Sequence, residues 1–535
     1  MIQRRQGLPV HPLLIAATIA AVVLVVLPIW GMGLSYVQPT GLFALPPMVF
    51  SDLLPLIWRS LALAIGVSAL SLCMGTWLAW IENRTDFRGR HLLSLLAVLP
   101  LATPSYLIAS MVRHEMAPEG SVGKILGRTE AFTGFWPALL VLTVACTPYV
   151  HILVSAALQR CPAEEEEAAR SLGAGPFRIL RTVLFPRLRP SLSFAMVLVS
   201  LYVVSDFGAV AILDCEVLTW ELYQHRGSRD AVLLGFGLIA VVIPLLAIVR
   251  ILHGQAEVER RVTQRAHHRR PLRGAAWTVS FALLVLVIGL GVFLPVLTLG
   301  NWVWMGFSNP NIHFAPILNA AGGTLLYSTL GAILVLCMAF APAWLTARRG
   351  GTTGTVVENA VYLTSSVPGI LIAVGLLQLM LGLKRMFPEA NAIWGTLEAG
   401  GIFLLIGYGM RFLAQAYAAL KPAMLQVNLS AEESARLLGA SPWRRFRTLN
   451  LPALQPGLWA AYMLVFLGIA KELPITLTLL PLDHTTLSYR IYSGQEEAVL
   501  QNVGLSGIIL LVFAIGLQLA IIQWRAHVER AHHHA

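Results

Sequence analysis

The side chains with the clearest capacity for chemistry are charged groups placed inside long apolar runs. Asp206 falls within the run at about 192–213, and Lys471 and Glu472 fall within the run at about 457–479. Charges are costly in hydrocarbon and are usually retained there for a function. Asp206 and Glu472 are predicted to line a cation route or to form part of a gate. The alternative is that Lys471 pairs with an acid and only holds helices together.

A second pattern joins acidic residues, small residues, a glycine and a proline, and it occurs twice along the chain. Glutamates favour the positive N-terminal end of a helix, and a glycine supplies the left-handed residue that ends it. Small residues let another surface approach that helix closely. Each copy therefore predicts a helix, a turn and a second helix that a proline ends, a rigid elbow suited to docking on a partner. The first copy has Glu167, Ala168, Ala169, Gly173 and Pro186, and the second has Glu433, Ser434, Ala435, Gly439 and Pro452.

The composition of the 535-residue chain is that of a membrane protein. Hydrophobic residues make up 57% and charged residues 12% of the chain, and the mean hydropathy is +0.71. Soluble domains carry about 25% charged residues, so a soluble enzyme, a disordered scaffold and a secreted disulfide domain are excluded. The net charge of +11 comes from basic residues clustered between the apolar runs. Such clusters indicate the orientation of the chain in the membrane rather than, in the first place, a binding partner. Five cysteines without a CxxC pair indicate neither a disulfide framework nor a metal cluster.

About twelve apolar runs are long enough to cross a hydrocarbon layer of about 30 Å as helices. The predicted fold is therefore all-α and integral to the membrane. The runs lie near 13–33, 58–81, 92–112, 135–158, 192–213, 231–252, 275–298, 323–346, 358–382, 399–420, 457–479 and 499–523.

The distribution of lysine and arginine between these runs predicts the orientation. With the N-terminus inside, the inside segments hold 27 basic residues and the outside segments hold nine. Basic residues favour the cytoplasmic side, so both termini are predicted to be cytoplasmic. The first run, at 13–33, is interpreted as a membrane anchor because it is too long for a signal peptide and has no small-residue cleavage site.

The chain repeats itself at a nearly constant offset. Residues 72–74 recur as residues 336–338, 264 positions later, and Gly173 matches Gly439, 266 positions later. Tandem repeats of this kind are common in transporters. The predicted parts are a first six-helix unit at 1–253, a basic cytoplasmic linker at 254–274 and a second six-helix unit at 275–535.

The doubled pattern resembles the EAA loop of binding-protein-dependent ABC importer permeases. We call its copies the first EAA loop, at about 160–191, and the second EAA loop, at about 421–456. Ser434 replaces the middle alanine of the family pattern, a small change that still allows close approach. By the resemblance, each loop is the coupling helix that seats in a cleft of an ATPase subunit and passes its closure to the membrane.

The resemblance also implies partners. The chain contains no GxxxxGK[ST] phosphate-binding loop, so ATP is expected to be hydrolysed by a separate ABC ATPase subunit, in two copies per chain. This chain is expected to be no enzyme and to bind no cofactor directly. A periplasmic solute-binding protein and a place in the bacterial inner membrane are implied as well, with alternating access between the two units as the transport mechanism.

Further segments resemble the fused, double-length permeases of ferric-iron importers over nearly the whole chain. The resemblance is carried by the residues around Asp206, by those around Lys471 and Glu472, and by residues 368–373. It implies that a periplasmic protein captures ferric iron and that this permease conducts it. No cluster of tyrosine, histidine and carboxylate side chains resembling an iron site is visible, which fits a permease that conducts rather than captures.

Other solutes and one other mechanism stay open. Permeases for thiamine, phosphonate, sulfate and polyamines share much of the same framework. A secondary carrier can also have two parallel six-helix halves, although it does not predict the two EAA loops. Arg411 and His151, two further polar groups within predicted spans, are interpreted as interfacial or snorkelling side chains, and the alternative is that they line the path.

Overall fold

The computed structural model describes residues 27–34, 50–87, 96–161, 163–228, 230–253, 273–307, 314–348, 351–364 and 367–533, with a few positions between 15 and 23. Within these residues nine helices are long and apolar enough to cross a membrane, or ten if one bent pair is counted as a single span. The predicted linker, 254–274, lies almost entirely outside the described residues, as does part of the first predicted run, 13–33. The all-helical membrane fold predicted from the sequence is confirmed.

The helices of the first unit follow the order of the predicted runs. They are α2 (Leu27–Leu34), α3 (Phe50–Arg84), η2 (Leu99–Ala102), α5 (Ser105–Glu115), α6 (Ser121–Ile125), α7 (Phe135–Arg160), α8 (Ala163–Ser171), α9 (Pro176–Ile179), η3 (Leu180–Leu184), α10 (Phe185–Ser205), α11 (Gly208–Ile212), α12 (Leu218–Gln224) and α13 (Asp230–His253).

The second unit repeats this order and ends in a long helix. Its helices are α14 (Ala275–Ile288), η4 (Gly289–Phe293), α15 (Leu294–Phe307), α16 (Ala315–Arg348), α17 (Thr352–Thr364), α18 (Gly369–Met386), η5 (Pro388–Ala390), α19 (Asn391–Ala399), α20 (Ile402–Gln426), α21 (Leu429–Leu437), α22 (Pro442–Arg445), η6 (Phe446–Asn450), α23 (Leu451–Ala470), α24 (Pro474–Leu479), α25 (Leu487–Glu496) and α26 (Leu500–His533).

The spans pack through small residues. A Cβ atom added to Gly75 of α3 would lie 2.6 Å from the Cβ of Val150 on α7. A Cβ added to Gly457 of α23 would lie 2.3 Å from the Cβ of Ala423 on α20. Lipid tails are as apolar as leucine, so helices in a membrane associate through close van der Waals packing, which these glycines permit.

The first helix of each unit packs on the other unit. α2 lies against α18, so closely that a Cβ on Gly31 would be 2.2 Å from the backbone oxygen of Gly375. In the opposite direction, α14 contacts α3, where the indole Nε1 of Trp77 donates to Ser280 Oγ at 3.0 Å. Each of the two packed bodies therefore contains a helix from the other unit.

Four predicted spans are not continuous helices, and here the sequence prediction is wrong. In the predicted run 92–112, the helical segment ending at Ala102 and α5 meet at an angle of 99°. The other runs break between α10 and α11, between α17 and α18, and between α23 and α24. Hydropathy does not reveal such breaks, because the residues on both sides are apolar. Proline precedes α5 and α18, and proline disfavours a helical residue before it.

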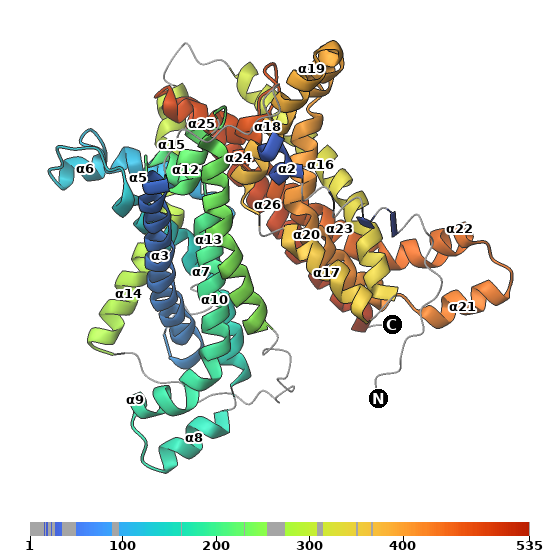
Figure 1. Cartoon of the computed structure of the whole chain (residues 1–535). Helices are drawn as coiled ribbons and strands as arrows, with labels where there is room; N and C mark the ends of the chain where they lie inside the picture. Colours follow the sequence, from blue (N-terminus) through green and yellow to red (C-terminus); the bar gives the residue numbers. More distant parts are fainter. Residues whose placement is uncertain are drawn as a thin grey trace.

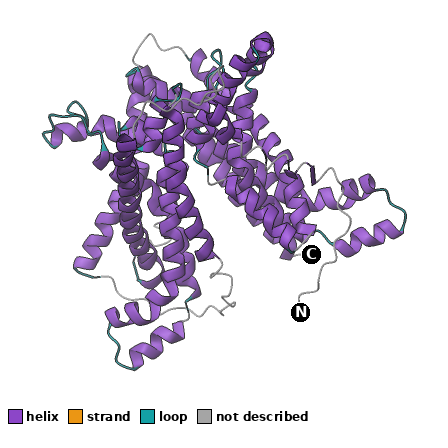
Figure 2. Ribbon diagram, viewed as in Figure 1, coloured by secondary structure: helices purple, strands orange, loops and turns teal. Residues whose placement is uncertain are grey.

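The two bodies form a pair of legs that diverge toward the EAA loops (Figure 1). The first EAA loop, with α8 and α9, lies at the far end of one leg, and the second, with α21 and α22, lies at the far end of the other. The legs meet at the opposite end, near α12, α24 and α25. Figure 2 shows that helices make up nearly all of both legs. We call the diverging end the EAA-loop end.

Candidate functional site

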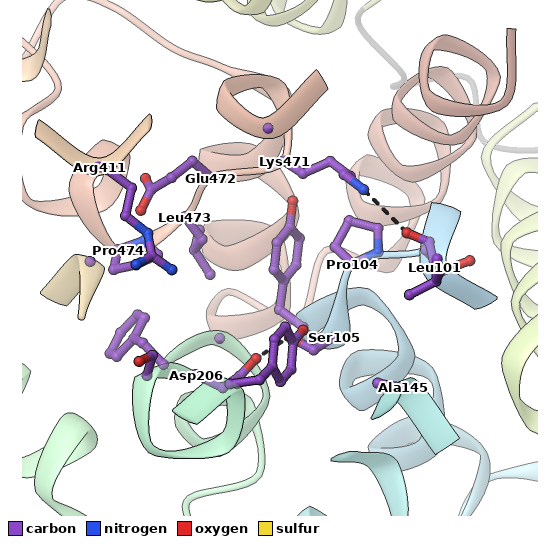
Figure 3. Close-up of a pocket in the computed structure, with 18 of the residues that line it drawn as sticks. Leu101, Pro104, Ser105, Ala145, Asp206, Arg411, Lys471, Glu472, Leu473 and Pro474 are labelled. Atoms are coloured by element: carbon purple, nitrogen blue, oxygen red, sulfur yellow. Dashed lines mark hydrogen bonds between the residues drawn. The ribbon is translucent and has the colours of Figure 1, made fainter. Parts of the chain in front are cut away.

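The four helix breaks surround one cavity of about 460 Å³ between the two units. We call it the central cavity (Figure 3). The residues that begin α5, α11, α18 and α24 all line it. The other lining residues include Leu101, Pro104, Tyr106, Ala145, Tyr149, Tyr202, Asp206 and Phe207 from the first unit, and Arg411, Gln415, Gly468, Lys471, Glu472 and Leu473 from the second.

The lining of the central cavity follows the repeat. Asp206 and Glu472 occupy positions 266 residues apart, and so do Ala145 and Arg411. The pairs Tyr149 with Gln415, Tyr202 with Gly468 and Ser205 with Lys471 have the same spacing. Equivalent positions of the two units thus face one cavity, although the side chains at these positions differ in size and charge.

Asp206 caps a helix at the edge of this cavity. It follows the last residue of α10, where it was predicted to lie inside a continuous helix. Its Oδ1 accepts the backbone N–H of Ala209 at 2.9 Å, and its Oδ2 accepts a hydrogen bond from Ser105 Oγ at 2.5 Å. The carboxylate therefore holds the start of α11 and joins it to the start of α5.

Glu472 has the same role in the second unit. Its carboxylate accepts the backbone N–H groups of Ile475, at 3.0 Å, and Thr476, at 3.1 Å, at the start of α24. Only 8% of the residue is exposed. A Cβ added to Gly369, the first residue of α18, would lie 3.0 Å from Glu472 Oε1. A glycine at this position lets α18 begin directly beside the carboxylate.

Replacing this glycine tests how tightly the cavity wall is packed. We expect Gly369→Ala to destabilise the protein by about 1–2 kcal/mol, because the new methyl group meets a carboxylate held by several hydrogen bonds. Gly322→Ala is the matched control, since it lies inside α16 with nothing within 4 Å of the added Cβ. Thermal unfolding in detergent should show a lower midpoint for Gly369→Ala alone. Equal midpoints would contradict the close approach of α18 to Glu472.

Lys471 joins the two units. Its Nζ donates to the backbone oxygen of Leu101, at the end of η2, at 3.2 Å (Figure 3). Among the described residues, no ion pair links Lys471 to Asp206 or Glu472, the local pairing that was the alternative in the sequence analysis. Lys471 instead crosses from the end of α23 to the first unit.

Arg411 and His151 do not lie where the sequence analysis placed them. Arg411 of α20 lines the central cavity on the side of Glu472, and its guanidinium donates to the backbone oxygen of Val367 at 3.0 Å. His151 is 2% exposed and lies 2.8 Å from a carboxylate oxygen of Glu82. Both are interior groups rather than interfacial ones. Hydropathy alone does not distinguish an interior polar group from an interfacial one, because both residues lie within apolar helices.

Tyrosines complete the polar wall of the central cavity. Tyr106, Tyr149 and Tyr202 line it from three different helices, together with the two carboxylates. The hydroxyl of Tyr106 is buried and has no hydrogen-bond partner among the described residues. The sequence analysis found no cluster of tyrosine and carboxylate side chains, because these residues come together only through the packing of α5, α7 and α10.

An aromatic cluster, Phe207, Tyr223 and Tyr492, lies beside the cavity at the end where the legs meet. The Phe207 ring centroid is 4.8 Å from that of Tyr223, in the same unit, and 6.3 Å from that of Tyr492, in the other. Burial raises the pKa of both phenols, so they remain neutral and pack as apolar rings. Ser110 also donates to Gln495 between α5 and α25. These contacts join the two units at the end opposite the EAA loops.

The EAA loops have the helix, turn and helix that the sequence predicts. Gly173 has a φ of +78° and Gly439 a φ of +79°, the left-handed conformation expected after α8 and α21. Ser441 caps α22 by accepting the N–H of Arg444 at 3.3 Å. The side chains and backbone that the pattern singled out are open to contact: Glu167, Ala168, Gly173, Glu433, Ser434 and Gly439 are exposed, and Ala169 and Ala435 are half-buried.

Pro186 and Pro452 were predicted to end the second helix of each loop. The structure shows that they do not. Pro186 is the second residue of α10, and Pro452 is the second residue of α23. The π-helical turns η3 and η6 precede them, so the chain stays helical into the membrane. A π-turn changes the hydrogen-bond pattern, which accommodates a residue that lacks a backbone N–H.

An ion pair holds each EAA loop to a membrane helix, and the pair in the first loop is buried. Arg84, the last residue of α3, places its Nε 2.9 Å from Glu166 Oε1 on α8, and the two side chains are 4% and 5% exposed. Arg348, the last residue of α16, lies 2.6 Å from a carboxylate oxygen of Glu432 on α21. These pairs were not predicted from the sequence. The repeat contained a signal for them, because both the arginine and the glutamate of the first pair recur in the second unit at the offsets of the repeat.

One family has a sequence pattern that covers both units. Its description is "binding-protein-dependent transport system inner membrane component", and it matches residues 71–263 and again residues 338–531. The chain belongs to this family. It is therefore a multi-pass inner-membrane permease of the ABC importer type, with its two units fused in one chain.

Relatives of this permease differ in the solutes that their names state. The chain is 26% identical over 450 residues to the Fe(3+)-transport system permease protein FbpB 2 of Haemophilus influenzae, covering 83% of this chain and 84% of the relative. It is 29% identical over 230 residues to the sulfate transport system permease protein CysW of Escherichia coli, covering 41% of this chain and 79% of the relative. It is 32% identical to the molybdenum transport system permease protein ModB of Escherichia coli, covering 28% and 69%.

Proposed function

We propose that this permease imports ferric iron that a periplasmic binding protein delivers. The observation that carries the iron assignment is the match to the ferric permease of Haemophilus influenzae, which runs through both units at 26% identity. The sulfate and molybdenum permeases match 41% and 28% of this chain, with 79% and 69% of their own length covered, so each match extends over about one unit. The central cavity supports the proposal, because its phenols and carboxylates are oxygen donors of the kind that hard cations prefer.

The EAA loops are the proposed contacts with a separate ATPase, one copy on each loop. Their exposed and half-buried small residues allow close approach, and the ion pairs Arg84 with Glu166 and Arg348 with Glu432 connect them to α3 and α16. Movement of a loop is thereby passed to a helix that spans the membrane. The EAA-loop end and both termini are proposed to be cytoplasmic, as the basic residues predict.

Import of an oxyanion is the second candidate, and a specific observation favours it. Two helices of more than ten residues, α5 and α18, have their N-termini at the central cavity. Helix N-termini carry partial positive charge, and half-helices of transporters direct them at anionic solutes. Arg411 and Lys471 add two positive charges. Asp206 and Glu472 supply two negative charges at the same cavity, which offset those of Arg411 and Lys471.

ATP hydrolysis in the reconstituted complex distinguishes the candidates. The chain is purified with its co-expressed nucleotide-binding subunit and reconstituted in lipid nanodiscs. Binding proteins loaded with ferric iron, sulfate or molybdate are then added one at a time. Stimulation by the iron-loaded protein alone is the expected result. Stimulation by an oxyanion-loaded protein alone would overturn the iron assignment, and failure of any ATPase to associate would overturn the importer mechanism.

The aromatic cluster gives a prediction about alternating access. The legs diverge at the EAA-loop end and are joined at the other, so opening to the periplasm requires Phe207 and Tyr492 to separate. We expect Tyr492→Ala to raise ATP hydrolysis measured without binding protein by about five-fold, the lower end of typical coupling between sites. Trp220→Ala is the control, because Trp220 also contacts Phe207 but belongs to the same unit as Phe207. An equal rise in both variants would contradict a role for the contact between units.

A further inference from the structure

A second cavity, of about 850 Å³, lies at the junction of the first EAA loop with the membrane helices. We call it the junction cavity. Its wall is almost entirely apolar, with Leu72, Trp77, Trp80, Leu184 and Leu188 from α3, η3 and α10. Cys73, Leu180, Phe185 and Met196 also line it and are exposed, so the cavity opens on the outer face of helices that span the membrane.

The repeat shows why this cavity belongs to the first unit. Thr76 and Leu180 line it, and their equivalents in the second unit are Phe340 and Phe446, at the offsets of 264 and 266. The rings of Phe340 and Phe446 meet edge to face with centroids 6.0 Å apart, and both contact Trp344. Two aromatic rings thus lie where the first unit has a threonine and a leucine.

Basic groups stand at one end of the junction cavity. Arg84, Glu166 and Arg170 line it, which leaves one positive charge in excess. Arg84 is held by Glu166 at 2.9 Å, whereas the closest approach of Arg170 to Glu166 is 3.6 Å. The Nε of Arg170 has no hydrogen-bond partner among the described residues. An apolar wall that ends in arginines complements a molecule with a hydrocarbon chain and an anionic head.

We propose that the junction cavity binds one anionic phospholipid of the cytoplasmic leaflet. An acyl chain lies along Trp77, Trp80 and Leu188, and the phosphate lies at Arg170. Basic pockets between membrane helices on the cytoplasmic side are suited to such headgroups. Arg170 and Glu166 belong to α8, so the lipid contacts the first EAA loop as well as α3 and α10. This site lies outside the transport path and is specific to one of the two loops.

Native mass spectrometry of the full chain, released from nanodiscs of phosphatidylglycerol and phosphatidylcholine, tests the proposal. The double variant Thr76→Phe/Leu180→Phe gives the first unit the rings of the second and should retain one phospholipid fewer per chain than the wild type. The reverse variant, Phe340→Thr/Phe446→Leu, opens the equivalent place and should retain one more. Equal lipid counts in the filled variant and the wild type would overturn the proposal.

The headgroup is tested without changing the volume of the cavity. We expect Arg170→Gln to lower the preference for phosphatidylglycerol over phosphatidylcholine by about five-fold, the effect of one basic residue near an anionic headgroup. Arg436→Gln, the equivalent change in the second EAA loop, should leave the preference unchanged. The comparison of these two variants still tests the proposal if Thr76→Phe/Leu180→Phe does not fold. An unchanged preference in Arg170→Gln would show that no anionic head lies at this arginine.

Discussion

Arginine in place of Gly173 or Gly439 should remove the stimulation of ATP hydrolysis by the loaded binding protein. Both glycines are exposed, have a left-handed φ and have nothing within 4 Å of an added Cβ. A long charged side chain would therefore project from the turn between the two helices of the EAA loop. We expect it to obstruct docking of the ATPase and to reduce the stimulation about ten-fold or more, within the usual range of coupling between sites.

The matched control for this experiment is Gly351→Arg. Gly351 also has a left-handed φ, of +80°, and open space around it, but it lies between α16 and α17, outside both EAA loops. It bears the same cost of placing a side chain on a left-handed residue. Stimulation should therefore persist in Gly351→Arg. Loss of stimulation in all three variants would indicate general destabilisation and would contradict the assignment of the loops.

The turn glycines were predictable because local rules decide their structure. A glutamate-rich start, small residues and a glycine define the end of a helix within about ten residues, and the pattern occurs in both units. The repeat offset of 266 residues identifies Asp206 and Glu472 as equivalent positions. It did not predict that each would cap a short helix, because hydropathy treats the apolar residues on both sides of a break as one span.

Long-range contacts were beyond the sequence reasoning. Arg84 and Glu166 are separated by 82 residues, and nothing local marks them as partners. Arg411 was interpreted as interfacial because a single arginine in an apolar helix is ambiguous until the neighbouring helices are known. The phenols of Tyr106 and Tyr149 meet at one cavity only because α5 and α7 pack side by side. Apolar patterning therefore predicts the spans, whereas packing decides which polar groups come together.

The buried pair between Arg84 and Glu166 should have the largest effect on stability. Glu166→Ala leaves the Arg84 guanidinium buried without its carboxylate, and loss of one member of a buried pair typically costs about 3 kcal/mol or more. We expect a lower midpoint of thermal unfolding and weaker coupling of ATP hydrolysis to the binding protein. Glu432→Ala should cost less, because the Glu432 side chain is 18% exposed and water can screen the charge that remains.

A neighbouring ion pair, between α8 and α10, separates this effect from a general loss of charge. Glu165 pairs with Arg187, and these side chains are 41% and 43% exposed. Exposed pairs contribute at most about 1 kcal/mol, so Glu165→Ala should change the unfolding midpoint little. Similar midpoints for Glu165→Ala and Glu166→Ala would mean that the first EAA loop is not anchored through Arg84. A clear difference would indicate that Arg84, at the end of α3, connects the loop to the membrane helices. Arg84 also donates to the backbone oxygen of Leu158 on α7 at 2.8 Å, so it contacts a second membrane helix.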